Sequence, residues 1–238
     1  MIDSVFSHAG LADVHGDLFR NIVSLRASED LFDDLSDDPE QWQSAVQLEI
    51  ETKSPMFESP RPIIDRPFEE TTWNAAIGYP FAHWMRSRYS DGTFGVWYGA
   101  DGIETTVFET LYHWRRGLLE DAGFLAPGTR IERKVYRVGC DAALVDLRPA
   151  ISACPGLVDR KDYTLTQLVG ARLHREGHPG LVSRSARCAG DIHAVLNPQV
   201  LSQPRASCYL TYTLTSTGIE VEREPGVVWM TVGMEDLV

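Results

Sequence analysis

The feature that most constrains the fold is a succession of short strand-forming segments in the second half of the chain. Each contains several β-branched or aromatic residues, and turn-forming residues separate the segments. The run Ser216-Thr217-Gly218 is expected to turn a hairpin between two of them. The predicted strands are Thr129–Val138, Ala143–Leu147, Ala206–Leu214, Ile219–Arg223 and Val227–Val232.

Apolar residues at helical spacing interrupt the strands and predict helices at Glu40–Thr52, Thr106–Glu120 and Leu165–Glu176. Because helices and strands do not alternate regularly, we expect an α+β fold with a central β-sheet flanked by helices. No internal repeat or linker divides the chain. We therefore expect a single domain over residues 1–238, with an extra segment of about 37–84 inserted before the region richest in motifs.

The composition narrows the classes of function. Hydrophobic residues make up 43% of the chain, enough for a core, and the formal net charge is −12. This charge repels a polyanion, so direct binding of nucleic acid is not expected. There is no basic and apolar leader and no apolar run of about 20 residues, so we expect a cytoplasmic protein without membrane contact.

The cysteines and histidines give little support for a metal site. Cys140, Cys154, Cys188 and Cys208 form no C-x-x-C pair and are expected to be free thiols. His174 and His178 have the four-residue spacing of two ligands on a helix, but no third ligand is evident. We expect neither a metal nor a resident cofactor.

Three segments carry the residues that indicate chemistry. Arg88 precedes an aromatic and β-branched segment, Phe94–Tyr98, that is typical of a strand. Glu109 follows Tyr98 by eleven positions, near the start of the next predicted helix, so the end of the strand and the start of the helix can share one cleft. Much later, Ser185 lies between Arg184 and Arg187, as in a loop that faces an anion.

At these residues the chain resembles the RES domain family, named for its arginine, glutamate and serine. Its members degrade NAD and often act as bacterial toxins paired with an antitoxin. The resemblance covers Leu18–Arg26, Arg86–Tyr112 and Gly180–Pro198.

The resemblance implies a fold like that of ADP-ribosyltransferase toxins, with Arg88, Tyr98, Glu109 and Ser185 in the active site. Arg20 matches an arginine near the N-terminus of the family. The chain departs from the family pattern at Ser87, Ser90, Arg184 and His193.

The chemistry of NAD suggests a role for each of these residues. Loss of nicotinamide builds positive charge on the ribose, which the carboxylate of Glu109 would stabilise. Arg88, and Arg20 as a second donor, would hold the diphosphate through forked hydrogen bonds. Tyr98 would stack on the cationic nicotinamide ring while its hydroxyl binds a ribose or phosphate oxygen. Ser185 would hydrogen-bond the substrate, since no nucleophile elbow surrounds it.

We therefore expect an NAD phosphorylase or glycohydrolase, with phosphate as the favoured acceptor and water as the other. A cognate antitoxin is an expected partner, and a homodimer is left open. Two alternatives also stay open: transfer of ADP-ribose to a protein in the same cleft, and a catalytically silent binding or regulatory module.

Each site residue has a structural interpretation as well. Thr106 and Glu109 have the spacing of a capping box, which on spacing alone is the better interpretation. Tyr98 alone would be a core residue, and Arg88 alone a partner in a surface ion pair. A Ser185/His193 nucleophile pair lacks an orienting carboxylate, so a hydrolase triad is not expected.

Overall fold

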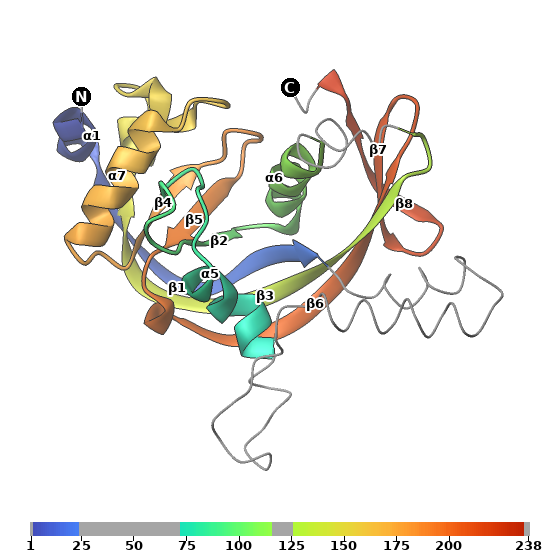
Figure 1. The fold of residues 1–238 in the computed structure, drawn as a ribbon, viewed down its shortest axis with the longest axis horizontal. Helices are drawn as coiled ribbons and strands as arrows, with labels where there is room; N and C mark the ends of the chain where they lie inside the picture. Colours follow the sequence, from blue (N-terminus) through green and yellow to red (C-terminus); the bar gives the residue numbers. More distant parts are fainter. Residues whose placement is uncertain (1, 24–71, 116–125, 236–238) are drawn as a thin grey trace, which may run out of the picture.

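The computed structural model describes residues 2–23, 72–115 and 126–235, and a single mixed β-sheet is its centre (Figure 1). The strand order is β1-β2-β5-β4-β3-β6-β7-β8, and β1 also pairs with β3. The strands are β1 (Gly10–Val23), β2 (Trp97–Ala100), β3 (Arg130–Asp146), β4 (Gly180–Arg184), β5 (Asp191–Val195), β6 (Leu201–Leu214), β7 (Gly218–Glu224) and β8 (Val227–Gly233).

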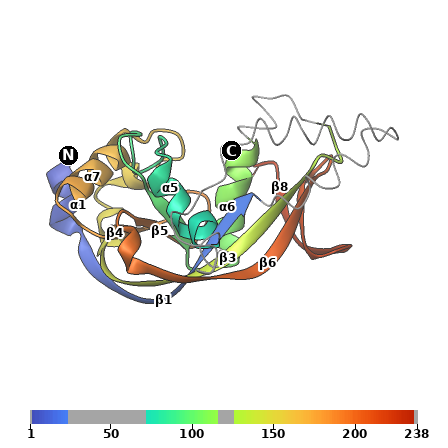
Figure 2. The ribbon, with the colours of Figure 1, turned by 60° about the horizontal axis from the view of Figure 1, so that its bottom comes forward.

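Three long strands, β1, β3 and β6, form the curved base of the molecule (Figure 2). β1 and β3 are antiparallel over the whole length of β1, from Gly10 opposite Asp146 to Val23 opposite Arg133. β1 also pairs with β2, and the sheet continues from β2 through β5 and β4 to β3. Because β3 pairs with β1, the first five strands form a closed ring of pairings. Among the pairings of the described strands, only the one between β3 and β4 is parallel.

The helices lie against this sheet. They are α1 (Ile2–His8), α5 (Tyr79–Ala82), α6 (Ile103–Trp114) and α7 (Thr164–Arg175), with a π-helical turn at Asn74–Gly78. Short 3₁₀ turns occupy Arg148–Ala150, Pro155–Val158 and Pro198–Val200. No described helix is long and apolar enough to cross a membrane.

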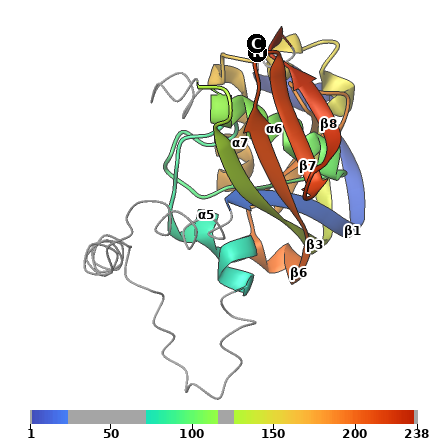
Figure 3. The same ribbon diagram turned by 90° about the vertical axis from the view of Figure 1, so that its right-hand side faces the viewer.

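α6 covers the sheet where β3, β6, β7 and β8 lie side by side (Figure 3). Its apolar residues Ile103, Val107, Leu111 and Trp114 recur every three or four positions and therefore share one face. That face packs on the buried side chains of Val135, Leu210, Tyr212, Ile219, Val221 and Val232. Other residues of α6, among them Thr106, Glu109 and His113, line a cavity together with Trp114.

The α+β fold class predicted from the sequence is confirmed, with corrections to several elements. The predicted strands Thr129–Val138 and Ala143–Leu147 are parts of one strand, β3, which continues through Gly139. The predicted strand Phe94–Tyr98 begins later, at Trp97. The hairpin at Ser216–Gly218 and the helix at Leu165–Glu176 are confirmed. The helix at Glu40–Thr52 and most of the inserted segment lie outside the described residues.

All four cysteines are free, as expected, and Cys140 and Cys154 are buried. Among the described residues, no three His, Cys, Asp or Glu side chains gather in a way that could hold a metal ion. His174 stacks on Phe94 with 4.3 Å between ring centroids, and His178 pairs with Glu176.

Candidate active site

A cavity of about 880 Å³ opens between β1, β2, β3 and α6. Its size falls within the range of small-molecule and cofactor sites. The walls include Arg20, Arg88, Tyr98 and Glu109, which come from four different segments of the chain. The structure thus brings together four of the five residues predicted from the sequence, and the fifth, Ser185, lies directly behind Glu109.

Glu109 projects from α6 and is held by the loop after β4. The hydroxyl of Ser185 donates to Oε1 of Glu109 over 2.6 Å. The same oxygen of Ser185 accepts backbone N–H groups from Arg187 (2.9 Å) and Cys188 (3.3 Å). The serine is therefore fixed by its own loop, and it in turn fixes the carboxylate of Glu109.

A close approach between this loop and α6 makes the hydrogen bond geometrically feasible. Gly190 lies so near Thr105 that a side chain at position 190 would overlap the threonine hydroxyl. The backbone N–H of Ser185 also donates to the carbonyl of Gly190 over 2.8 Å, which closes the loop. The contact of Gly190 with Thr105 and the hydrogen bond of Ser185 to Gly190 therefore hold Ser185 close to α6.

The capping-box interpretation of Thr106 and Glu109 is wrong. α6 begins at Ile103, three residues before the predicted start, and the residue at its cap is Gly102. Thr106 already lies inside the helix, where its hydroxyl donates to the carbonyl of Ile103 over 2.6 Å. Glu109 is past the first turn, so its side chain is not needed by the helix end and is available to the cavity.

Arg88 is buried, with 7% of its surface exposed, on the loop between α5 and β2. Its Nη1 donates to the carbonyl of Asp159 over 2.8 Å, and its guanidinium lies 4.5 Å from the ring centroid of Tyr163. Its buried Nη2 has no hydrogen-bond partner among the described residues. Burying an unpaired charged donor costs free energy. An anion that accepts a hydrogen bond from this donor would offset that cost.

α7 holds the loop that carries Arg88. The side-chain amide of Gln167 donates to the carbonyls of Ser87 (2.9 Å) and Ser90 (3.3 Å). One turn later, Gly170 touches the backbone of Tyr89 so closely that any side chain there would collide with its carbonyl. The departures from the family pattern at Ser87 and Ser90 thus fall within a loop that several contacts hold.

Tyr98 supports the same loop through its hydroxyl. The hydroxyls of Tyr98 and Ser87 are 2.9 Å apart, and the backbone N–H of Tyr89 donates to the Tyr98 hydroxyl over 2.9 Å. Burial raises the pKa of Tyr98 well above its usual range, so it is a neutral phenol. The hydroxyl therefore supports the loop, while Tyr98 also packs against the core and lines the cavity.

Arg20 reaches the cavity from β1. Its Nη1 donates to the backbone carbonyl of Tyr98 over 3.1 Å, and its guanidinium lies 5.4 Å from the Trp97 ring centroid. Burial, together with the nearby positive charge of Arg133, lowers the pKa of Arg20 to about 10. Arg20 stays protonated near neutral pH. A nearby negative charge would offset the cost of burying its guanidinium next to Arg133.

Two residues of the site were not predicted from the sequence. Arg133 on β3 and Tyr163 before α7 both line the cavity. Neither stands in a motif, and only the pairing of β1 with β3 and the packing of α7 bring them there. Arg187, which sequence analysis places beside Ser185, is 8% exposed, and its Nη2 donates to the carbonyl of Arg160 (2.6 Å) and the hydroxyl of Tyr163 (3.2 Å).

Two further departures from the family pattern lie away from the cavity lining. Arg184 is exposed and donates to the carbonyl of Ala189 over 2.6 Å. His193 is buried in β5, opposite Gly99 on β2 and Val182 on β4, and burial lowers its pKa. Within the described chain, the Ser185 hydroxyl is engaged by Glu109, Arg187 and Cys188, and the buried Nδ1 of His193 has no hydrogen-bond partner.

Comparison with known proteins gives a match to a family by sequence and distant matches by structure. The sequence profile of the RES domain matches residues 63–215, a range that contains Arg88, Tyr98, Glu109 and Ser185 but not Arg20. No curated protein matches the chain. A crystal structure of the M. tuberculosis MbcT-MbcA toxin-antitoxin complex contains a similar chain, with 12% identity, 90% coverage of this chain, 91% of that chain and a TM-score of 0.47.

Proposed function

Since the chain belongs to the RES domain family, we propose that it breaks the bond between nicotinamide and ribose in NAD. Family membership confirms the resemblance inferred from the sequence. The observation that carries the proposal is the carboxylate of Glu109, held at 2.6 Å by Ser185 in a cavity that Arg20 and Arg88 also line. The cavity thus combines one oriented negative charge with donors for phosphate groups.

The proposed reaction uses Glu109 on the sugar. As the C–N bond lengthens, its electron pair moves to the pyridine nitrogen, which becomes neutral, while positive charge grows on the ribose. A fixed carboxylate beside that sugar stabilises the transition state more than the ground state. Ser185 would keep the carboxylate in place, because the serine is itself tied to two backbone N–H groups.

Arg88 would hold the diphosphate of the substrate. Arg88 keeps a buried donor, Nη2, without a partner in the described part of the chain, and a diphosphate oxygen would satisfy it. Arg20 supplies a second guanidinium on the same cavity. The ring of Tyr98 would face the nicotinamide, since its hydroxyl is already engaged by the loop at residues 87–89.

Phosphate is the acceptor we favour. An oxygen of inorganic phosphate would form the new bond to the ribose carbon, and its proton would leave to solvent, so that the products are ADP-ribose phosphate and nicotinamide. Water would give ADP-ribose instead. The family resemblance also leads us to propose a toxin controlled by an antitoxin protein, because unregulated loss of NAD harms a cell.

The test follows nicotinamide release from NAD by the purified chain, with and without phosphate, and the mass of the ribose product. Glu109→Gln removes the charge and keeps the size, so release should fall by orders of magnitude, about 10²-fold or more. Glu104→Gln changes an exposed carboxylate on the same helix and should retain the activity of the parent.

Three results would count against the proposal. A Glu109→Gln protein as active as the parent would remove Glu109 from the chemistry. A parent protein that releases no nicotinamide would leave the NAD reaction unsupported and favour the silent binding module. Labelled NAD that marks an added protein would favour transfer of ADP-ribose to a side chain.

A further inference from the structure

Arg20 and Arg133 both line the cavity, and they lie close enough for the charge of Arg133 to lower the pKa of Arg20. They extend from β1 and β3, which are antiparallel neighbours, and both side chains line the cavity. Asn21 orients Arg133, since its side-chain oxygen accepts from Nε and its backbone carbonyl accepts from Nη2, each over 3.0 Å. Arg20 is anchored on the carbonyl of Tyr98. Both arginines are therefore held in defined positions.

No carboxylate neutralises this pair within the described residues. Their hydrogen bonds there go to neutral oxygens of Asn21 and Tyr98, and the buried Nε of Arg20 has no partner. Burial lowers the pKa of both arginines, and Arg133 adds to the effect on Arg20. Two like charges in a partly buried place destabilise each other, and an anion between them would offset that repulsion.

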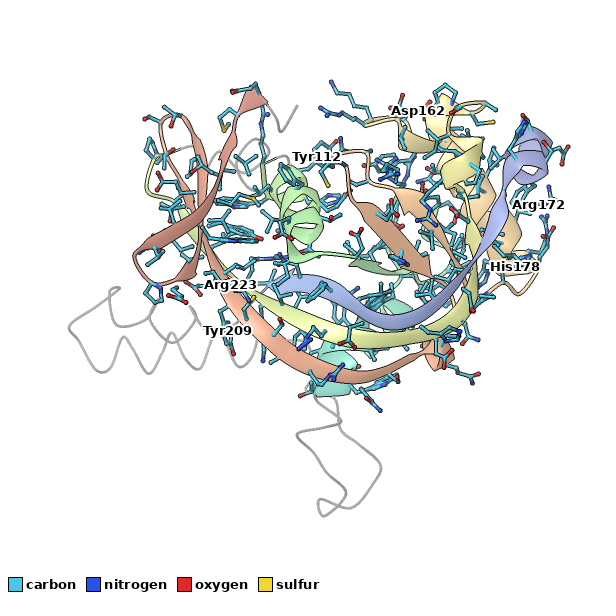
Figure 4. The ribbon with its side chains drawn as sticks, turned by 180° about the vertical axis from the view of Figure 1, so that it is seen from behind. Tyr112, Asp162, Arg172, His178, Tyr209 and Arg223 are labelled. Carbon is cyan, nitrogen blue, oxygen red and sulfur yellow. The ribbon has the colours of Figure 1, made fainter. Side chains whose placement is uncertain are left out.

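A second cationic place lies further along the same cavity, around Arg88. Its guanidinium faces Tyr163, and the hydroxyl of Tyr163 accepts from Arg187 over 3.2 Å. Arg187 stacks on Tyr112 of α6, 3.3 Å from the ring centroid. Figure 4 shows Tyr112 on α6, and it also labels Asp162, a cavity residue on the loop beside Tyr163.

Two contacts along α6 indicate how the surroundings of Arg133 and of Arg88 are separated. The side chain of Asn21, which holds Arg133, also donates to Thr106 over 3.3 Å. Tyr112, which lies under Arg187, is six positions later on the same helix, or about 9 Å at 1.5 Å per residue. Glu109 is midway between Thr106 and Tyr112. Along α6, the contact with Asn21 therefore lies three residues before Glu109, and the contact with Arg187 lies three residues after it.

We propose that Arg20 and Arg133 bind the free phosphate that accepts the ribose, while the place around Arg88 binds the diphosphate of NAD. The inference rests on the proposed function, because only phosphorolysis brings two separate phosphate-bearing substrates to one carboxylate. Two arginines can each present a fork of N–H donors to a tetrahedral anion. Arg133 is thus assigned as a phosphate-binding residue that determines the acceptor.

The experiment compares Arg133→Gln and Arg133→Lys with the parent. Arg137→Gln is the matched control, because Arg137 lies four positions along the same strand, outside the cavity lining, and pairs with Asp17. Two quantities are measured for each protein: binding of inorganic phosphate by calorimetry without NAD, and the KM for phosphate and for NAD in nicotinamide release. Thermal melting by circular dichroism checks the fold, and Arg133→Lys replaces Arg133→Gln if the latter does not fold.

We expect Arg133→Gln to weaken phosphate binding and raise the KM for phosphate about tenfold or more, with the KM for NAD within about twofold. Arg133→Lys should fall between the parent and Arg133→Gln, since it keeps the charge and loses the fork. Loss of phosphate binding in Arg133→Gln would support the anion site even if the parent did not cleave NAD.

Two outcomes would overturn the inference. Unchanged phosphate binding in the folded Arg133→Gln protein would exclude this pair as the anion site. A raised KM for NAD with an unchanged KM for phosphate would show that the pair holds the diphosphate and not the acceptor.

Discussion

At the scale of single residues, the structure gives Ser185 a task other than the one predicted for it. Sequence reasoning placed its hydroxyl on the substrate, whereas in the structure the hydroxyl donates to Glu109 and accepts two backbone N–H groups. The hydroxyl therefore connects the loop after β4 with the carboxylate of Glu109. Substrate contact stays a prediction, and the two roles differ in their kinetic consequences.

Ser185→Ala should lower kcat and leave the KM for NAD nearly unchanged. A hydrogen bond to a charged group contributes about 1.5–3 kcal/mol, so its loss should reduce kcat about 10- to 100-fold if the carboxylate is then poorly oriented. Ser183→Ala, two residues earlier and also buried, is the control and should stay within about twofold of the parent. A raised KM for NAD with an unchanged kcat would instead support direct contact between Ser185 and substrate.

At the scale of elements, the sheet explains what sequence reasoning could and could not predict. β7 alternates apolar and polar residues and β8 is rich in β-branched and aromatic residues, so both short strands were predicted nearly to their ends. β1 was missed, because its glycine, aspartate and histidine residues weaken the strand pattern and its stability comes from pairing with β3 along its whole length. Arg133 enters the site through that long-range pairing, which no local motif encodes.

The strand β5 carries a histidine that should make the fold sensitive to acid. Burial lowers the pKa of His193 and is the largest effect. The charges of Asp101 and Asp191 raise the pKa, the charge of Arg148 lowers it, and these effects are smaller. The unfolded chain therefore binds a proton more readily than the folded chain. The contribution of His193 to the free energy of unfolding is fully present above the pKa of the unfolded chain, about 6.5. It is lost as the pH falls below that value, by at most about 1.4 kcal/mol per pH unit.

His193→Asn should remove this contribution and flatten the loss of stability as the pH falls below about 6.5. The free energy of unfolding in urea, measured across that pH range, checks it. His8→Asn, at the exposed end of α1, is the control and should keep the slope of the parent. An unchanged slope in His193→Asn would show that the acid sensitivity arises elsewhere.

At the scale of the whole molecule, the closure of the sheet brings the residues of the candidate site together. Arg20, Tyr98 and Glu109 come from β1, β2 and α6, while Ser185 follows β4. The sequence identified these residues through their resemblance to a family, because spacing alone favoured a helix cap, a core tyrosine and a surface arginine. What the sequence did not provide is the order of charges across the cavity, since that order depends on which strands become neighbours.

The proposed activity has a consequence for a cell that makes the protein. Induced expression of the parent chain should lower cellular NAD and stop growth, and Glu109→Gln should relieve both effects, because the same carboxylate is required for each. Glu104→Gln should remain as harmful as the parent, and restored growth on co-expression of one other protein would identify the antitoxin. If Glu109→Gln stops growth as strongly as the parent at equal protein levels, the harm does not come from cleavage of NAD. Growth arrest without a fall in NAD would also contradict the proposed activity.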